Sequence, residues 1–127
     1  MKPFKLIRPT TPKEAMESEA GDQATYMAAG TDLLNRIKEH VASPDSVVDL
    51  KQMPGMDQIE SAERGIWLGA LVKLTDVAQH GEIRQRFPAV STTVGQAATP
   101  QIRNMATVGG NLCQKPRCWY LRHEGYP

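Results

Sequence analysis

The chain has 127 residues, of which 40% are hydrophobic and 23% are charged, a composition typical of one globular domain rather than of a disordered chain. Its formal net charge of +1 excludes the strongly basic character that indicates binding to nucleic acid or to an anionic membrane surface. No apolar run approaches the roughly 20 residues of a membrane-spanning helix, the N-terminus does not resemble a signal peptide, and 2 cysteines are too few for a disulfide framework. We therefore expect a cytoplasmic protein that binds no nucleic acid and does not insert into a membrane.

The N-terminal part of the chain predicts strands that alternate with helices. Thr11-Pro12-Lys13-Glu14 has the pattern of a capping box, and Gly21 is a suitable end for the helix that follows. Because parallel strands need long connections, this alternation predicts a small parallel β-α-β sheet. The predicted elements are strands at residues 4–7, 25–28 and 46–50, and helices at about 12–20 and 33–40.

The C-terminal part predicts a hairpin followed by short helices. Arg64-Gly65 is the predicted turn of the hairpin, and Thr75 or Asp76 is expected to cap the first helix. The predicted elements are strands at 58–62 and 66–71, a helix at 75–80 that residues 83–87 extend, a helix from Pro88, a short turn at 102–105 and a loop at 108–111.

The charge is distributed unevenly along the chain. Residues 1–102 carry 11 basic and 13 acidic side chains, whereas residues 103–127 carry 4 basic side chains and 1 acidic one. Over so short a segment this excess is explained either by chance or by a site for an anionic or electron-rich group.

The first candidate site is Ala28-Ala29-Gly30-Thr31-Asp32-Leu33, which joins a predicted strand to a predicted helix. Unpaired backbone N–H groups at such a junction can bind phosphate without a lysine, and Gly30 allows close approach of the backbone. The alternative is an ordinary turn capped by Thr31 or Asp32.

The second candidate site is Thr107-Val108-Gly109-Gly110-Asn111. Paired glycines can turn successive N–H groups toward one anion, and Thr107 and Asn111 add side-chain donors. The alternative is a glycine-rich turn between elements. The patterns of a P-loop and of a Rossmann dinucleotide site are both absent from the sequence.

Cys113 and Cys118 form the third candidate site, with Arg117 and His123 nearby. Thiolates bind iron–sulfur clusters or zinc, but this set does not complete a site, and its spacing matches no common zinc pattern. Ordinary reduced thiols are the alternative. Neither a Cys–His pair with an orienting third group nor a pair of carboxylates is evident, so no catalytic residue is predicted.

Taken together, these segments resemble the flavin-binding medium subunit of molybdenum hydroxylases. This family includes xanthine and aldehyde dehydrogenases, carbon monoxide dehydrogenase and hydroxybenzoyl-CoA reductase. The most specific match is Gln101 to Leu112, and the order and spacing of the segments match over almost the whole chain. The other matching segments are Ala28 to Leu34, Val47 to Leu50, Leu68 to Ala70 and Phe87 to Ala89.

The resemblance implies an α+β, PCMH-type FAD-binding fold with two α/β subdomains: a small parallel β-α-β subdomain at about 1–53, and the start of a second subdomain at 54–127. It also implies that both glycine motifs wrap the diphosphate of FAD. Ala29 stands where the family usually has glycine, and a backbone with positive φ there would cost roughly 1 kcal/mol or more.

The resemblance further implies a partner subunit with the molybdenum cofactor, a partner subunit with [2Fe–2S] centres, and electron transfer through FAD to an acceptor. The segment from Asn111 to Arg122 is similar to a branch that also carries a [4Fe–4S] cluster, with Cys118 the better candidate ligand and Cys113 a doubtful one. Family subunits are more than twice this long, so we expect a truncated fragment. The alternatives are a flavin oxidoreductase of the same fold that acts without molybdenum partners, and a non-catalytic fragment that only packs against other subunits.

Overall fold

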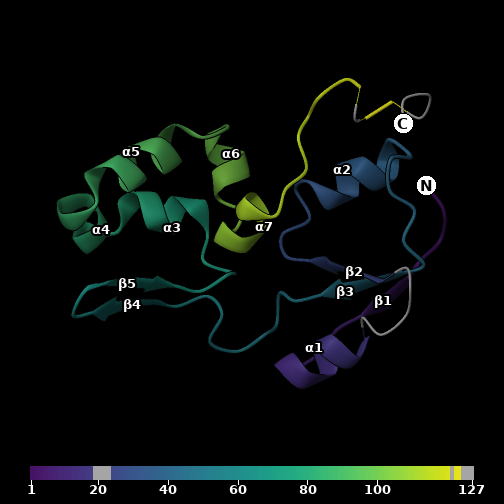
Figure 1. Cartoon of the computed structure of the whole chain (residues 1–127), viewed down its shortest axis with the longest axis horizontal. Coiled ribbons are helices and arrows are strands. Elements are labelled where there is room, and N and C mark those ends of the chain that lie inside the picture. Colours follow the sequence, from purple (N-terminus) through teal and green to yellow (C-terminus); the bar gives the residue numbers. More distant parts are fainter. Residues whose placement is uncertain (19–23, 121, 124–127) are drawn as a thin grey trace.

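The strands predicted in the N-terminal part form one parallel sheet in the computed structural model, which describes residues 1–18, 24–120 and 122–123. β3 (Ser46–Asp49) lies in the middle and pairs in parallel with both β1 (Lys5–Ile7) and β2 (Ala24–Met27). The crossover helices α1 (Pro12–Ser18) and α2 (Leu33–Lys38) cover opposite faces of this sheet (Figure 1). The predicted parallel β-α-β arrangement is therefore confirmed.

The start of α1 differs in one contact from the predicted capping box. The Thr11 hydroxyl accepts a hydrogen bond from the Glu14 N–H at 3.2 Å, as expected of an N-cap residue. The Glu14 carboxylate, however, accepts from the N–H of Thr10 at 2.8 Å, one residue before the cap. This bond and a second one from the Thr10 hydroxyl lower the pKa of Glu14. The helix end predicted at Gly21 lies outside the described residues.

The C-terminal part contains the predicted hairpin and a layer of short helices beside it (Figure 1). β4 (Ile59–Ala62) and β5 (Gly65–Leu68) pair in an antiparallel register in which Ala62 faces Gly65, which confirms the hairpin. The helices are α3 (Leu74–Gln79), α4 (Gly81–Arg86), α5 (Pro88–Gln96), α6 (Pro100–Arg103) and α7 (Val108–Leu112).

The start and the end of the predicted helix at 75–80 are both corrected. Its N-cap is Lys73, which makes no side-chain capping bond, while the Thr75 hydroxyl donates instead to Asn104 Oδ1 at 2.7 Å. His80 has an extended backbone, with φ −64° and ψ 123°. Residues 83–87 therefore do not extend α3: α4 is a separate helix that begins at Gly81.

The glycine-containing segment predicted as a loop at 108–111 is helical, and the predicted turn at 102–105 overlaps α6. In α7 the Thr107 hydroxyl accepts a hydrogen bond from the Gly110 N–H at 3.2 Å. The N–H groups of Val108 and Gly109 donate to the carbonyls of Val72 and Ala70, at 2.9 and 2.8 Å. These bonds to a distant segment outweigh the low helix propensity of glycine.

Buried apolar residues form core clusters in both parts of the chain. Val47 and Val48 of β3 are fully buried, Val47 toward α2 and Val48 toward α1. In the helical layer, Val72 and Val77 are buried in the core. Among the described residues, no helix has the length and apolar character needed to cross a membrane.

Candidate cofactor-binding site

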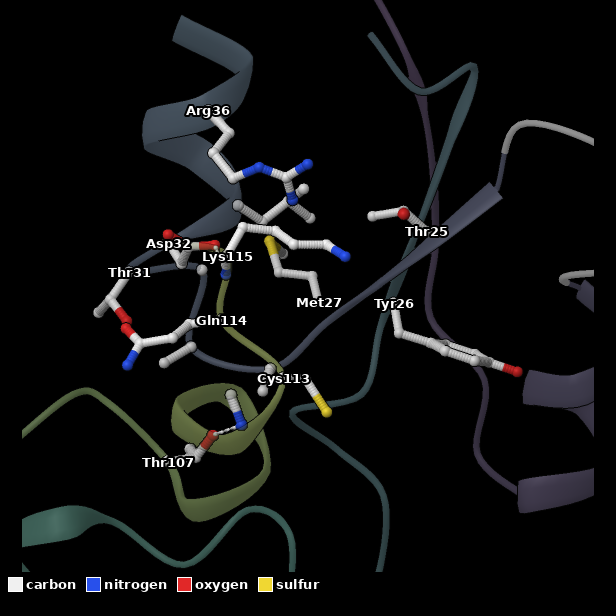
Figure 2. A pocket seen from close by; sticks show the side chains of 15 residues that line it. Thr25, Tyr26, Met27, Thr31, Asp32, Arg36, Thr107, Cys113, Gln114 and Lys115 are labelled. Carbon is white, nitrogen blue, oxygen red and sulfur yellow. Dashed lines mark hydrogen bonds between the residues drawn. The ribbon is translucent and has the colours of Figure 1, made fainter. Parts of the chain in front are cut away.

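A cavity of about 220 Å³ lies where the loop between β2 and α2 faces α7 (Figure 2). All residues of the first candidate motif, Ala28 to Leu33, line it. Of the second motif, Thr107 and Gly110 line it, whereas Val108, Gly109 and Asn111 do not. The fold thus brings together two motifs that are far apart in the sequence.

The first motif has one residue in the left-handed backbone region. Gly30 has φ +80°, and a Cβ atom there would lie 2.9 Å from Leu34 Cδ1. Ala29 is not among the described non-glycine residues with positive φ. The alanine that replaces the usual glycine of the family therefore causes no backbone strain at this position.

The same loop presents unused hydrogen-bond donors. Within the described part of the chain, the N–H groups of residues 29–33 have no acceptor; the first helical bond of this segment runs from the Leu34 N–H to the Gly30 carbonyl. Asp32 is the N-cap residue of α2, but its carboxylate makes no capping bond. A row of free N–H groups beside a cavity is suited to an anionic oxygen.

The second motif does not form the anion nest that its glycines predicted. The N–H groups of Val108, Gly109 and Gly110 donate to chain acceptors, and that of Asn111 donates to the Thr107 carbonyl at 2.8 Å. The glycines instead allow close packing. A Cβ atom at Gly109 would lie 3.0 Å from the Ala70 carbonyl oxygen, and one at Gly110 would lie 3.0 Å from Thr107 Oγ1.

Residues 113–120 and 122, here called the strap, run from α7 back across the start of α2. Cys113 and Lys115 line the cavity. Cys118 lies elsewhere, in a second hollow of about 410 Å³ that it shares with Arg117 and Trp119 of the strap. Both thiols are exposed and unbonded, and the described residues contain no cluster of three or more potential metal ligands. Iron–sulfur ligation by Cys118 or Cys113 stays a prediction.

Arg122 anchors the strap to α2 and to the first motif. Its Nη2 lies 2.7 Å from Asp32 Oδ1, its Nη1 lies 3.1 Å from Glu39 Oε2, and its side chain is only 12% exposed. Burial lowers the pKa of Arg122, but the bonds to Asp32 and Glu39 outweigh it, so the net shift is upward. Sequence reasoning noted Arg122 only as part of the basic tail.

The fold and this site define an α/β domain with free backbone donors beside a cavity that both glycine motifs line. Residues 2–117 match the family described as the FAD binding domain in molybdopterin dehydrogenase, and the chain belongs to this family. The family and fold class expected from the sequence are therefore confirmed, and the cofactor of the family is FAD.

Individual relatives agree with this assignment. The chain is 36% identical over 129 residues to the aldehyde oxidoreductase FAD-binding subunit PaoB of Escherichia coli, covering 100% of this chain and 40% of the relative. It is 35% identical over 115 residues to the nicotinate dehydrogenase FAD-subunit of Eubacterium barkeri, covering 88% and 39%. The solved carbon monoxide dehydrogenase of Hydrogenophaga pseudoflava superposes with a TM-score of 0.81 at 27% identity, covering 88% of this chain and 40% of that chain. The chain thus spans about 40% of the length of these relatives.

Proposed function

We propose that this chain holds the diphosphate portion of FAD in the electron-transfer subunit of a molybdenum-containing hydroxylase or dehydrogenase. The observation that carries the proposal is the single cavity lined by both glycine motifs. The free N–H groups of residues 29–33 are its donors, and Thr107 and Gly110 form the opposite wall. Val108, Gly109 and Asn111 contribute by holding α7 in place.

The residues present fit part of the cofactor. A cavity of about 220 Å³ is smaller than typical sites for whole ligands, so it suits one segment of a dinucleotide rather than all of it. Bound FAD would supply the ability to accept and release electrons. In this proposal the chain binds and orients the cofactor, and the absence of a catalytic side chain stays a prediction.

The partners in this proposal are a subunit with the molybdenum cofactor and a subunit with [2Fe–2S] centres. Its support is that two relatives are FAD-binding subunits, one of an aldehyde oxidoreductase and one of a nicotinate dehydrogenase. We also propose that residues 1–53 form the first subdomain and that residues 54–127 begin the second. The parallel sheet and the hairpin with its helices correspond to this division.

The variant Gly110→Val tests the site. The valine side chain would enter the space beside Gly110, where an added Cβ atom would lie 3.0 Å from Thr107 Oγ1 and 3.7 Å from Ala28 Cβ. We expect the variant, isolated with its native partners, to lose its flavin, measured as absorbance after release from the protein. Gly81→Val is the matched control because a Cβ atom there meets nothing within 4 Å. A Gly110→Val protein with full flavin content would contradict the assignment.

A further inference from the structure

The cavity carries an excess of positive charge that the backbone donors do not explain. Its charged lining residues are Asp32, Arg36 and Lys115. Asp32 is paired with Arg122, at 2.7 Å, and Arg122 also pairs with Glu39, which does not line the cavity. In the described part of the chain, neither the Arg36 guanidinium nor the Lys115 ammonium has an ion pair or a hydrogen-bond acceptor. Figure 2 shows both side chains extending to the Met27 side of the cavity, Arg36 from α2 and Lys115 from the strap.

The position of Lys115 depends on the anchor of the strap. The Lys115 N–H donates to Asp32 Oδ2 at 3.2 Å, and the Lys115 carbonyl accepts from Arg122 Nη2 at 3.4 Å. Arg122 also donates to the carbonyl of Pro116 at 3.2 Å. The Asp32–Arg122 pair therefore holds the backbone of Lys115 on both sides, which fixes where its side chain starts.

Two cations that share one cavity repel each other, and an anion between them removes that cost. A diphosphate with about two negative charges can pair with the two cations of the cavity lining that have no ion pair among the described residues, and bonds between ions are stronger than bonds between neutral groups. Because the first N–H groups of α7 are all used within the chain, this wall offers an anion no backbone donors, and the two cations add to the donors of residues 29–33.

We propose that Arg36 and Lys115 bind the diphosphate of the cofactor, and that Arg122 is a positioning residue that holds Lys115 in place and cancels the charge of Asp32. This inference rests on the proposed function and deepens it. The site then combines the N–H groups of the first motif with two side-chain cations, one of them delivered by the C-terminal strap.

The first test compares Arg36→Gln and Lys115→Gln with the unaltered protein. FAD is removed from the native assembly, and its dissociation constant is measured by flavin fluorescence at low and high salt. We expect each variant to bind FAD about tenfold more weakly at low salt, and to show a smaller loss of affinity as salt is raised. The controls Lys38→Gln on α2 and Arg117→Gln on the strap remove a charge that does not line the cavity, and should bind FAD normally.

The outcomes separate this inference from the proposed function. If the unaltered protein binds no FAD, the proposed function is wrong and the inference falls with it. If it binds FAD but both variants match it in affinity and salt dependence, only the inference is overturned. Lys115→Arg keeps the positive charge. If it binds FAD as tightly as the unaltered protein, the weaker binding of Lys115→Gln results from the lost charge and not from damage to the fold.

The second test concerns the anchor. Arg122→Gln leaves the Asp32 carboxylate unpaired at the cavity, so we expect weaker FAD binding. Adding Asp32→Asn to this variant removes the negative charge, and part of the affinity should return. Equal affinities for Arg122→Gln and the unaltered protein would overturn the role of the anchor. If Arg122→Gln and its combination with Asp32→Asn bind FAD with equal affinity, Arg122 does not act by cancelling the charge of Asp32.

Discussion

Gly30 and Ala29 are adjacent in the first motif but have opposite backbone requirements. Gly30 has φ +80°, which is unfavourable for residues with a Cβ atom, whereas Ala29 is outside the positive-φ region. The resemblance to the family implied a cost at Ala29 only if its φ were positive, because the family usually has glycine there. In the folded loop Ala29 lies outside the positive-φ region, so the position that requires glycine is Gly30.

Substitutions at these two positions should therefore have unequal effects. Gly30→Ala should lower the free energy of unfolding by about 1–2 kcal/mol, because φ +80° is retained and the added Cβ atom crowds Leu34. Ala29→Gly should not stabilise the protein and should cost up to about 1 kcal/mol, through greater freedom of the unfolded chain. Urea unfolding measures both. A more stable Ala29→Gly variant would show that the backbone at residue 29 is strained after all.

At the scale of elements, α7 shows how tertiary contacts override local propensity. Its sequence, Val108-Gly109-Gly110-Asn111-Leu112, favours a loop, and nothing in that segment alone predicts a helix. The helix forms because Thr107 caps it and because Val72 and Ala70 accept its first N–H groups. Those acceptors come from the segment that follows the hairpin, so they are invisible to local sequence reasoning.

The cap of α7 can be tested with variants of similar volume. Thr107 is only 6% exposed, so Thr107→Val keeps the packing but leaves the Gly110 N–H without its acceptor. We expect Thr107→Val to lower the free energy of unfolding by about 1 kcal/mol and to weaken FAD binding. Thr107→Ser retains the hydroxyl and should restore the helix cap. If both variants unfold at the same denaturant concentration, the hydroxyl is not what holds α7.

At the scale of the whole molecule, charged contacts connect elements that are separate in the chain. Glu82 of α4 accepts a hydrogen bond from Ser61 of β4 and from Arg86 in the next turn of its own helix. The bond from Ser61 and then that from Arg86 lower the pKa of Glu82 below its ordinary value of 4.5. The hairpin and the helical layer are thus linked by a carboxylate whose ionised form these bonds favour.

This link predicts a defined dependence of stability on pH. A carboxyl group whose pKa is lower in the folded state stabilises the fold above its unfolded pKa, and this contribution is lost as pH falls through the folded value. Glu82→Gln should therefore be less stable than the unaltered protein at neutral pH, and the difference should shrink as pH falls below about 4.5. Thermal unfolding across pH measures it. Glu60→Gln, on the hairpin that Glu82 contacts through Ser61, is the control, and a difference that grows on acidification would contradict the role of Glu82.

The local elements and the candidate motifs were predictable because their signals are short-range. Weak alternation and short apolar runs indicated β1, β2 and β3, Thr11 and Glu14 marked the start of α1, and the two glycine motifs were identified before any fold was known. The excess of basic residues after position 102 left two explanations open, chance or a site for an anionic or electron-rich group. Resemblance to a family supplied the name of the cofactor, which residue chemistry alone did not specify.

Only the tertiary structure decided which donors and charges are available to a ligand. In the described part of the folded chain the N–H groups of residues 108–111 donate to acceptors within the chain, whereas those of residues 29–33 are free. Asp32 pairs with Arg122, so the charged residues of the cavity without an ion pair to any described residue are Arg36 and Lys115. The sequence by itself determined the strands, the helices α1 and α2, and which segments carry chemistry, because those properties depend on neighbours in the chain. Hydrogen bonding and charge pairing depend on neighbours in space, and here those neighbours are up to 90 residues apart in the sequence.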